Sequence, residues 1–200
     1  HTEIKFPDGE NTTVLVIDDN DEIRKNVVGA FSSYVNVYEA SDGEEGLFKA
    51  FDILPDLIVS DVMMPVMDGF EVCQRIKTDE RTSHIPVILL TAKTSDSSKM
   101  TGLETGADDY VTKPFNPILL LIRAKNLIES RRKLSERFSK KILLQPSDIA
   151  INSTDEQFVT RALKIVEEHI SDSEFGVDQF VEAMGMGRTQ LYKKIKMLTN

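Results

Sequence analysis

The chain has 200 residues, enough for one ordinary domain and a smaller second unit. Its apolar share of 40% and charged share of 28% are typical of soluble globular proteins, and it has no run of 18 apolar residues that could span a membrane. The single cysteine, Cys73, excludes an internal disulfide. Because the chain begins with His1 rather than Met, we expect that it was cut from a longer protein or is a processed product. Its first residues lack the basic and apolar regions of a secretion signal, so we expect a cytoplasmic location.

The net charge of −9 is distributed unevenly. Residues 1–122 hold 10 Lys and Arg against 22 Asp and Glu, whereas residues 123–141 hold 8 against 2. An acidic globule followed by a basic segment indicates two functional parts. The acidic part is not expected to bind nucleic acid or an anionic membrane by itself.

Strand-like and helix-like patterns alternate along the first 125 residues. Strands are predicted at residues 14–17, 35–38, 57–60, 86–90 and 110–111. Helices are predicted at residues 23–31, 44–51, 70–76, 97–104 and from 117 onward. Short apolar strands that alternate with helices are typical of a parallel sheet covered on both faces. The predicted fold class is therefore α/β, with a doubly wound, five-stranded parallel sheet.

Polar residues follow these strands where each one ends: Asp18, Asp19, Asp61, Thr91 and Lys113. In a doubly wound sheet, a site forms beyond the carboxyl ends of the strands, so we expect all five to meet at one edge. An alternative is that Asp18 and Asp19 only cap the following helix while Asp61 starts a turn. The convergence of five suitable positions favours a site.

Three carboxylates at one edge repel one another and need a counter-ion. Mg²⁺ fits, because it prefers oxygen ligands and binds one or two carboxylates together with phosphate. Lys113 would add a compact positive charge and Thr91 a hydroxyl donor, which together suit phosphoryl transfer. Asp61 would be the nucleophile and would become an aspartyl-phosphate.

The stretches VLVIDDN, LIVSDVMMPVMDG, VILLTA and GADDYVTKPF resemble the receiver domain of bacterial response regulators. The domain is expected at residues 10–130. The resemblance implies a flavodoxin-like sheet with strand order 2-1-3-4-5. It also implies that Asp61 accepts phosphate from the phosphohistidine of a partner histidine kinase.

The same resemblance assigns further roles. Asp19, Asp61 and the main-chain carbonyl of Met63 would bind Mg²⁺ directly, and Asp18 would act through water. Lys113 would contact the phosphoryl group and precede a cis peptide bond. Thr91 and Tyr110 would form the switch pair, whose rearrangement on phosphorylation changes the surface.

Residues 131–153 are expected to form a helical linker after the receiver. Seven positions from 120 to 141 lie at heptad spacing, and five of them are apolar. A short two-stranded coiled coil and a plain linker helix both fit this pattern. A homodimer is therefore one expected assembly.

Residues 154–200 are predicted to form a small all-α piece with a Gly-containing turn at 185–187. This piece resembles the first helix-turn-helix half of an AraC-type DNA-binding domain, a family that carries two such halves. The resemblance implies a recognition helix from residue 188 onward, where four residues are basic and none is acidic. The candidate DNA contacts are Arg188, Thr189, Gln190, Tyr192, Lys193 and Lys194.

The leading hypothesis is a two-component response regulator, not an enzyme, in which phosphorylation of Asp61 controls dimerisation and transcription through DNA binding. The receiver and the AraC-type piece together resemble the C-terminal end of hybrid histidine kinases, and a free-standing regulator fits as well. Two alternatives are a phosphorelay receiver without DNA binding and a haloacid-dehalogenase-type aspartyl-phosphate phosphatase. The DxDx[TV] motif of the phosphatases is not matched at Asp18, Asp19 and Asn20.

Overall fold

The computed structural model describes residues 4–7, 11–92, 106–138, 153–170, 172 and 175–199. The chain forms two compact units. Unit 1 comprises His1–Lys77 and Ile85–Ser130, and unit 2 comprises Thr78–His84 and Arg131–Asn200. Within the described residues, no helix is both long enough and apolar enough to cross a membrane.

Unit 1 contains a five-stranded sheet in the order β2-β1-β3-β4-β5, with every neighbouring pair parallel. Its strands are β1 (Thr13–Ile17), β2 (Asn36–Ala40), β3 (Leu57–Asp61), β4 (Val87–Ala92) and β5 (Asp109–Lys113). The α/β class and the strand order are thus confirmed. The predicted strand at 110–111 was too short, because the polar ends of β5 hide its true length. The predicted helix at 97–104 lies outside the described residues.

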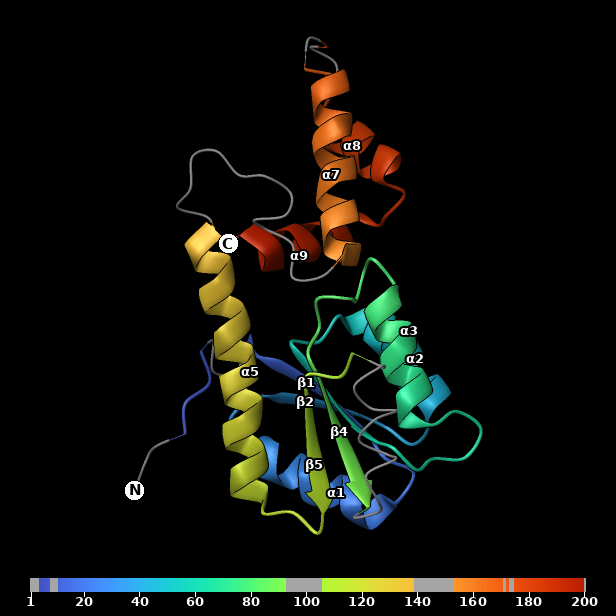
Figure 1. Cartoon of the computed structure of the whole chain (residues 1–200), viewed down its shortest axis with the longest axis vertical. Helices are drawn as coiled ribbons and strands as arrows, with labels where there is room; N and C mark the ends of the chain where they lie inside the picture. Colours follow the sequence, from blue (N-terminus) through green and yellow to red (C-terminus); the bar gives the residue numbers. More distant parts are fainter. Residues whose placement is uncertain are drawn as a thin grey trace. The chain divides into compact units, whose positions relative to one another are not determined.

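Helices cover both faces of this sheet (Figure 1). They are α1 (Asp21–Phe31), α2 (Gly43–Ile53), α3 (Gly69–Thr78) and α5 (Pro117–Phe138). Alternate strand residues enter two separate cores: Leu15 packs with α2 and α3, and Val16 packs with α1 and α5. This two-sided burial explains why the strands read as continuous apolar runs.

The first positions of the predicted heptad stripe belong to the second of these cores. Leu120 and Ala124 are fully buried, and Leu127 packs against the same cluster. This part of α5 is therefore used inside unit 1. The end of the stripe and most of the predicted linker lie outside the described residues.

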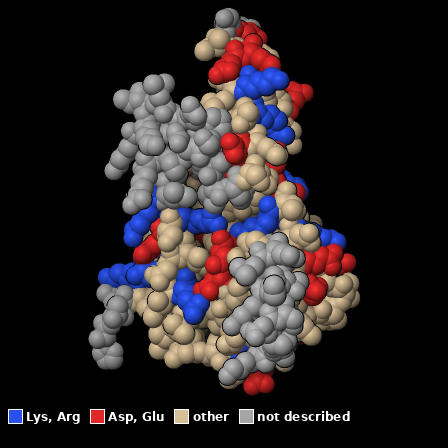
Figure 2. Space-filling view, viewed as in Figure 1, with Lys and Arg blue, Asp and Glu red and all other residues tan. Residues whose placement is uncertain are grey.

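From residue 153 onward, the described residues of unit 2 form α7 (Ser153–Glu168), α8 (Val177–Met184) and α9 (Arg188–Thr199). Phe158, Met184 and Leu191 bring one buried side chain from each helix into a common core. Gly185 ends α8 in the left-handed region, at φ 65°, where glycine is favoured. Figure 2 shows that α7 carries charged side chains of both signs on its visible face.

Two glycines of unit 1 give a matched test of how α3 is seated against β3. A Cβ on Gly69 would overlap the carbonyl oxygen of Asp61, whereas a Cβ on Gly29 in α1 meets nothing within 4 Å. We expect Gly69→Ala to lower the free energy of unfolding by about 1–3 kcal/mol through overpacking. Gly29→Ala should raise it by about 0.5–1 kcal/mol, because alanine restricts the unfolded chain. Urea denaturation of both variants checks this, and equal effects would contradict it.

Candidate functional site

The strand register brings the predicted site residues to one edge of the sheet. Ile17 pairs with Ser60 and Asp61 pairs with Leu90, so Asp18 and Thr91 follow directly at the same ends of β1 and β4. One carboxylate oxygen from each of Asp18, Asp19 and Asp61 lies within 4.8 Å of the other two. The acidic cluster expected from the sequence is present.

Lys113, at the end of β5, bridges two of these carboxylates. Its ammonium nitrogen Nζ lies 2.9 Å from Asp18 Oδ2 and 3.0 Å from Asp61 Oδ1. Asp18 is fully buried and Asp61 is 6% exposed, whereas Asp19 is open to solvent. A charge shared at hydrogen-bond distance offsets the repulsion between the two buried carboxylates.

Burial raises the pKa of Asp18 above its usual range. The hydrogen bond from Lys113 opposes this shift in the pKa, and so does the main-chain N–H of Asn20, which donates to Asp18 Oδ1 at 2.9 Å. The Asp61 charge adds a smaller upward contribution to the pKa. The site therefore concentrates negative charge in a place that favours a cation.

The helix after the two acids is capped by another residue. The Asn20 side chain accepts hydrogen bonds from the main-chain N–H groups of Glu22 and Ile23, at 3.0 and 3.1 Å. The alternative that Asp18 and Asp19 serve as the cap is therefore wrong. Asparagine before a helical pattern is a known capping signal, and the sequence analysis missed it.

The donor set suits Mg²⁺. Three carboxylates from two strand ends converge, and hard oxygen ligands of this kind are the ones that Mg²⁺ takes. Asp19, Asp61 and the carbonyl of Met63 would hold the ion, with Asp18 behind them. Met63 follows β3 by two residues and is 72% exposed.

The expected switch pair lies on adjacent strands. The Thr91 hydroxyl donates to the carbonyl oxygen of Ala92 at 3.0 Å, and Tyr110 is half-buried against the α2–α3 core. Lys113 is followed by a cis peptide bond to Pro114, as the resemblance implied.

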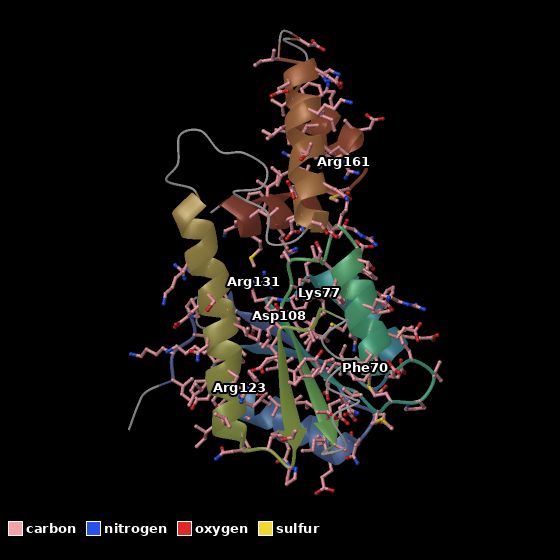
Figure 3. All side chains as sticks on the ribbon, in the orientation of Figure 1. Phe70, Lys77, Asp108, Arg123, Arg131 and Arg161 are labelled. Atoms are coloured by element: carbon pink, nitrogen blue, oxygen red, sulfur yellow. The ribbon has the colours of Figure 1, made fainter. Side chains whose placement is uncertain are left out.

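Two ion pairs that were not expected from the sequence hold the amino-terminal ends of β4 and β5, at the opposite ends of these strands from the site (Figure 3). Lys77 donates to Asp108 Oδ2 at 2.6 Å and to the carbonyl oxygen of Ile85 at 2.7 Å. Arg123 of α5 donates to Asp109 at 2.8 Å. Sequence periodicity cannot reveal such pairs, because their partners are distant in the chain.

In unit 2, the candidate DNA contacts are not equally accessible. Arg188, Thr189 and Tyr192 are exposed, whereas Gln190 and Lys193 are partly covered. The Arg188 guanidinium lies 3.3 Å from Asp178 Oδ1, and both side chains are mostly exposed. Such a pair contributes little to stability and can be exchanged readily.

Lys194 differs from these residues because it is fully buried. Its Nζ donates to Asp155 Oδ1 at 2.5 Å and to the Ser83 hydroxyl at 2.9 Å, and lies 3.3 Å from His84 Nδ1. Burial lowers the pKa of Lys194, and the Asp155 charge opposes that shift. In this arrangement the ammonium is not accessible to a DNA phosphate.

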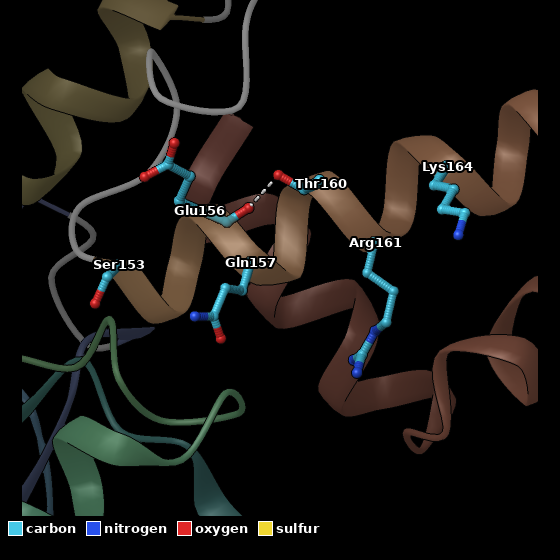
Figure 4. A pocket seen from close by; sticks show the side chains of 6 residues that line it. All are labelled: Ser153, Glu156, Gln157, Thr160, Arg161 and Lys164. Atoms are coloured by element: carbon cyan, nitrogen blue, oxygen red, sulfur yellow. Dashed lines mark hydrogen bonds between the residues drawn. The ribbon is translucent and has the colours of Figure 1, made fainter.

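A shallow hollow of about 510 Å³ runs along α7 and is lined by Ser153, Glu156, Gln157, Thr160, Arg161 and Lys164 (Figure 4). One guanidinium nitrogen of Arg161 is bound to Glu80 at 2.6 Å. The Thr160 hydroxyl is bound to the carbonyl oxygen of Glu156 at 2.7 Å. These contacts are structural, and none of the lining residues was predicted to act in the site.

Residues 14–125 match the response regulator receiver domain family. The chain therefore belongs to the receiver domains of two-component response regulators, a class that binds Mg²⁺ at an acidic pocket and interacts with histidine kinases.

Among known proteins, "Histidine kinase P4" of Formosa agariphila is 43% identical over 96% of this chain and 14% of its own length. Response regulator PleD of Caulobacter vibrioides is 40% identical over 62% of this chain and 27% of its own length. The chain thus spans only a small part of these relatives. The structure of the Francisella response regulator 1452 receiver domain aligns with a TM-score of 0.55 and 36% identity, over 60% of this chain and 98% of that domain.

The bridging role of Lys113 can be tested through stability. Lys113→Met would leave the buried Asp18 carboxylate without its counter-charge, which costs on the order of 3 kcal/mol. We expect this loss in urea denaturation without Mg²⁺. The double variant Lys113→Met/Asp18→Asn should recover most of it, because the unpaired charge is then gone. If the double variant instead lost the sum of the two single losses in free energy of unfolding, the proposed pairing of Lys113 with Asp18 would be contradicted.

Proposed function

We propose that this chain is a phosphorylation-dependent switch in which Asp61 accepts a phosphoryl group from a histidine kinase in the presence of Mg²⁺. The observation that carries this proposal is the cluster of three carboxylates within 4.8 Å, bridged by Lys113. Five residues from the ends of four strands supply a nucleophile, cation ligands, an ammonium and a hydroxyl. These are the groups that phosphoryl transfer requires.

In the proposed reaction, an Asp61 carboxylate oxygen attacks the phosphorus of the phosphohistidine. A P–O bond forms, the P–N bond breaks, and the leaving imidazole nitrogen takes up a proton. Bound Mg²⁺ would neutralise charge on the phosphoryl oxygens. The Lys113 ammonium, which lies 3.0 Å from Asp61 Oδ1, would bind a phosphoryl oxygen after the transfer and stabilise its negative charge.

The output would run through Thr91 and Tyr110. A phosphoryl oxygen beside Asp61 offers the Thr91 hydroxyl a stronger acceptor than the Ala92 carbonyl that it now contacts. Movement of Thr91 vacates space into which the half-buried Tyr110 ring turns. The altered surface would then control homodimerisation.

For unit 2, we propose the first half of an AraC-type DNA-binding domain, with α9 as the recognition helix. The exposed Arg188 and Thr189 at the start of α9 support this assignment. Similarity to a histidine kinase over 96% of this chain supports a parent protein of the hybrid type. The chain itself would then be a regulator rather than an enzyme, and the kinase activity would reside elsewhere in the parent.

Intact mass spectrometry after treatment with acetyl phosphate and Mg²⁺ tests the phosphorylation. We expect one added phosphoryl group, absent without Mg²⁺ and absent in Asp61→Asn, which removes the nucleophile. Circular dichroism of the variant controls for folding. An adduct of equal yield in Asp61→Asn would show that Asp61 is not the phosphoryl acceptor.

DNA binding can be tested with a labelled duplex at low salt, by fluorescence anisotropy. We expect weak binding whose affinity falls as salt rises, because phosphate contacts release counter-ions. Arg188→Ala should weaken binding and reduce the salt slope by about 1. Asp178→Ala should strengthen it, because the acid that pairs with Arg188 is removed. If neither variant changes the affinity, a phosphorelay receiver without DNA binding becomes the better interpretation.

A further inference from the structure

Arg24, on the first turns of α1, makes three hydrogen bonds to three different parts of unit 1. Its Nη1 donates to the main-chain carbonyl oxygen of Asp18 at 2.8 Å. Its Nη2 donates to Asp21 Oδ1 at 2.6 Å, and its Nε donates to Glu39 Oε2 at 3.1 Å. The Arg24 side chain is only 14% exposed, whereas its two carboxylate partners are 60% and 54% exposed.

The carbonyl that Arg24 holds belongs to the peptide group between Asp18 and Asp19. Because a peptide group is planar, fixing this carbonyl also fixes the direction in which the chain enters Asp19. Two main-chain N–H groups of this turn are also bonded: that of Asp18 donates to the Ala40 carbonyl at 3.2 Å and that of Asn20 to Asp18 Oδ1 at 2.9 Å. Arg24 adds a side-chain clamp from α1 and, through Glu39, ties the turn to β2.

We propose that Arg24 is a positioning residue for the cation site, holding the Asp18–Asp19 peptide so that both carboxylates face Asp61. This inference rests on the proposed Mg²⁺-dependent function. Arginine suits the task because its planar, forked donors can bind several acceptors at fixed angles, which a lysine ammonium cannot do.

Electrostatics and positioning make opposite predictions for the loss of Arg24. Removing a positive charge near a cation site should by itself strengthen Mg²⁺ binding. Losing an outer hydrogen bond that orients the ligands weakens metal affinity by roughly 10–100-fold. A weaker affinity in Arg24→Met therefore cannot come from its charge.

Lys25 provides a matched control. It is the next residue of α1, carries the same charge and also pairs with Asp21, at 2.5 Å. Its side chain is 71% exposed and donates to Asp21, whereas the Asp18 carbonyl receives its side-chain hydrogen bond from Arg24. Lys25→Met thus removes one charge and one Asp21 contact while leaving the clamp in place.

The experiment is isothermal titration calorimetry of Mg²⁺ into the unphosphorylated chain. We expect the dissociation constant to rise by roughly 10–100-fold in Arg24→Met and to stay the same or fall in Lys25→Met. Arg24→Lys should restore only part of the affinity, because a single ammonium can replace only some of the three hydrogen bonds that the guanidinium donates. Thermal unfolding of each variant separates loss of the fold from loss of the site.

Unchanged or tighter Mg²⁺ binding by folded Arg24→Met would overturn the positioning role, and so would equal weakening in Lys25→Met. If the wild-type chain itself binds no Mg²⁺, the proposed function fails and the role of Arg24 fails with it. These outcomes are distinguishable because the wild-type titration is read first.

Discussion

The ammonium of Lys113 between the carboxylates of Asp18 and Asp61 is the contact on which the rest of the site depends. Two acids that are both almost fully buried would otherwise repel each other and destabilise the strand ends that carry them. With Lys113 in place, the fold holds these two carboxyl groups close together. The same arrangement leaves the exposed Asp19 to complete a cation site.

The parallel sheet makes this arrangement possible, since it places the carboxyl ends of β1, β3, β4 and β5 along one edge. Local contacts then fix the position of each side chain in the site. Asn20 caps α1 and frees the two acids from that task, and Arg24 holds the peptide between them. Gly69 lets α3 begin against the Asp61 carbonyl, where any larger residue would collide. Packing, capping and charge thus act together on a few residues.

Much of this could be predicted from the sequence, because strand-end acids and apolar runs are local signals. Asp18, Asp61 and Lys113 were placed together correctly, and the strand order followed from the resemblance. The role of Asn20 was missed, although it was readable as a helix cap. The hydrogen bond from Arg24 to the Asp18 carbonyl could not be predicted from the sequence, because every residue type carries the same main-chain carbonyl. Likewise, α9 has basic residues and no acidic ones, which predicts an exposed basic face, yet Lys194 is buried against Asp155, 39 residues away in the chain.

Chemical trapping can identify the residue that accepts the phosphoryl group, which we propose to be Asp61. Borohydride reduces an aspartyl-phosphate to homoserine, which peptide mass spectrometry can locate after treatment with acetyl phosphate and Mg²⁺. We expect homoserine at position 61 alone, with Asp18 and Asp19 unchanged. Homoserine at either of those positions, or a phosphorylated chain with Asp61 intact, would contradict it.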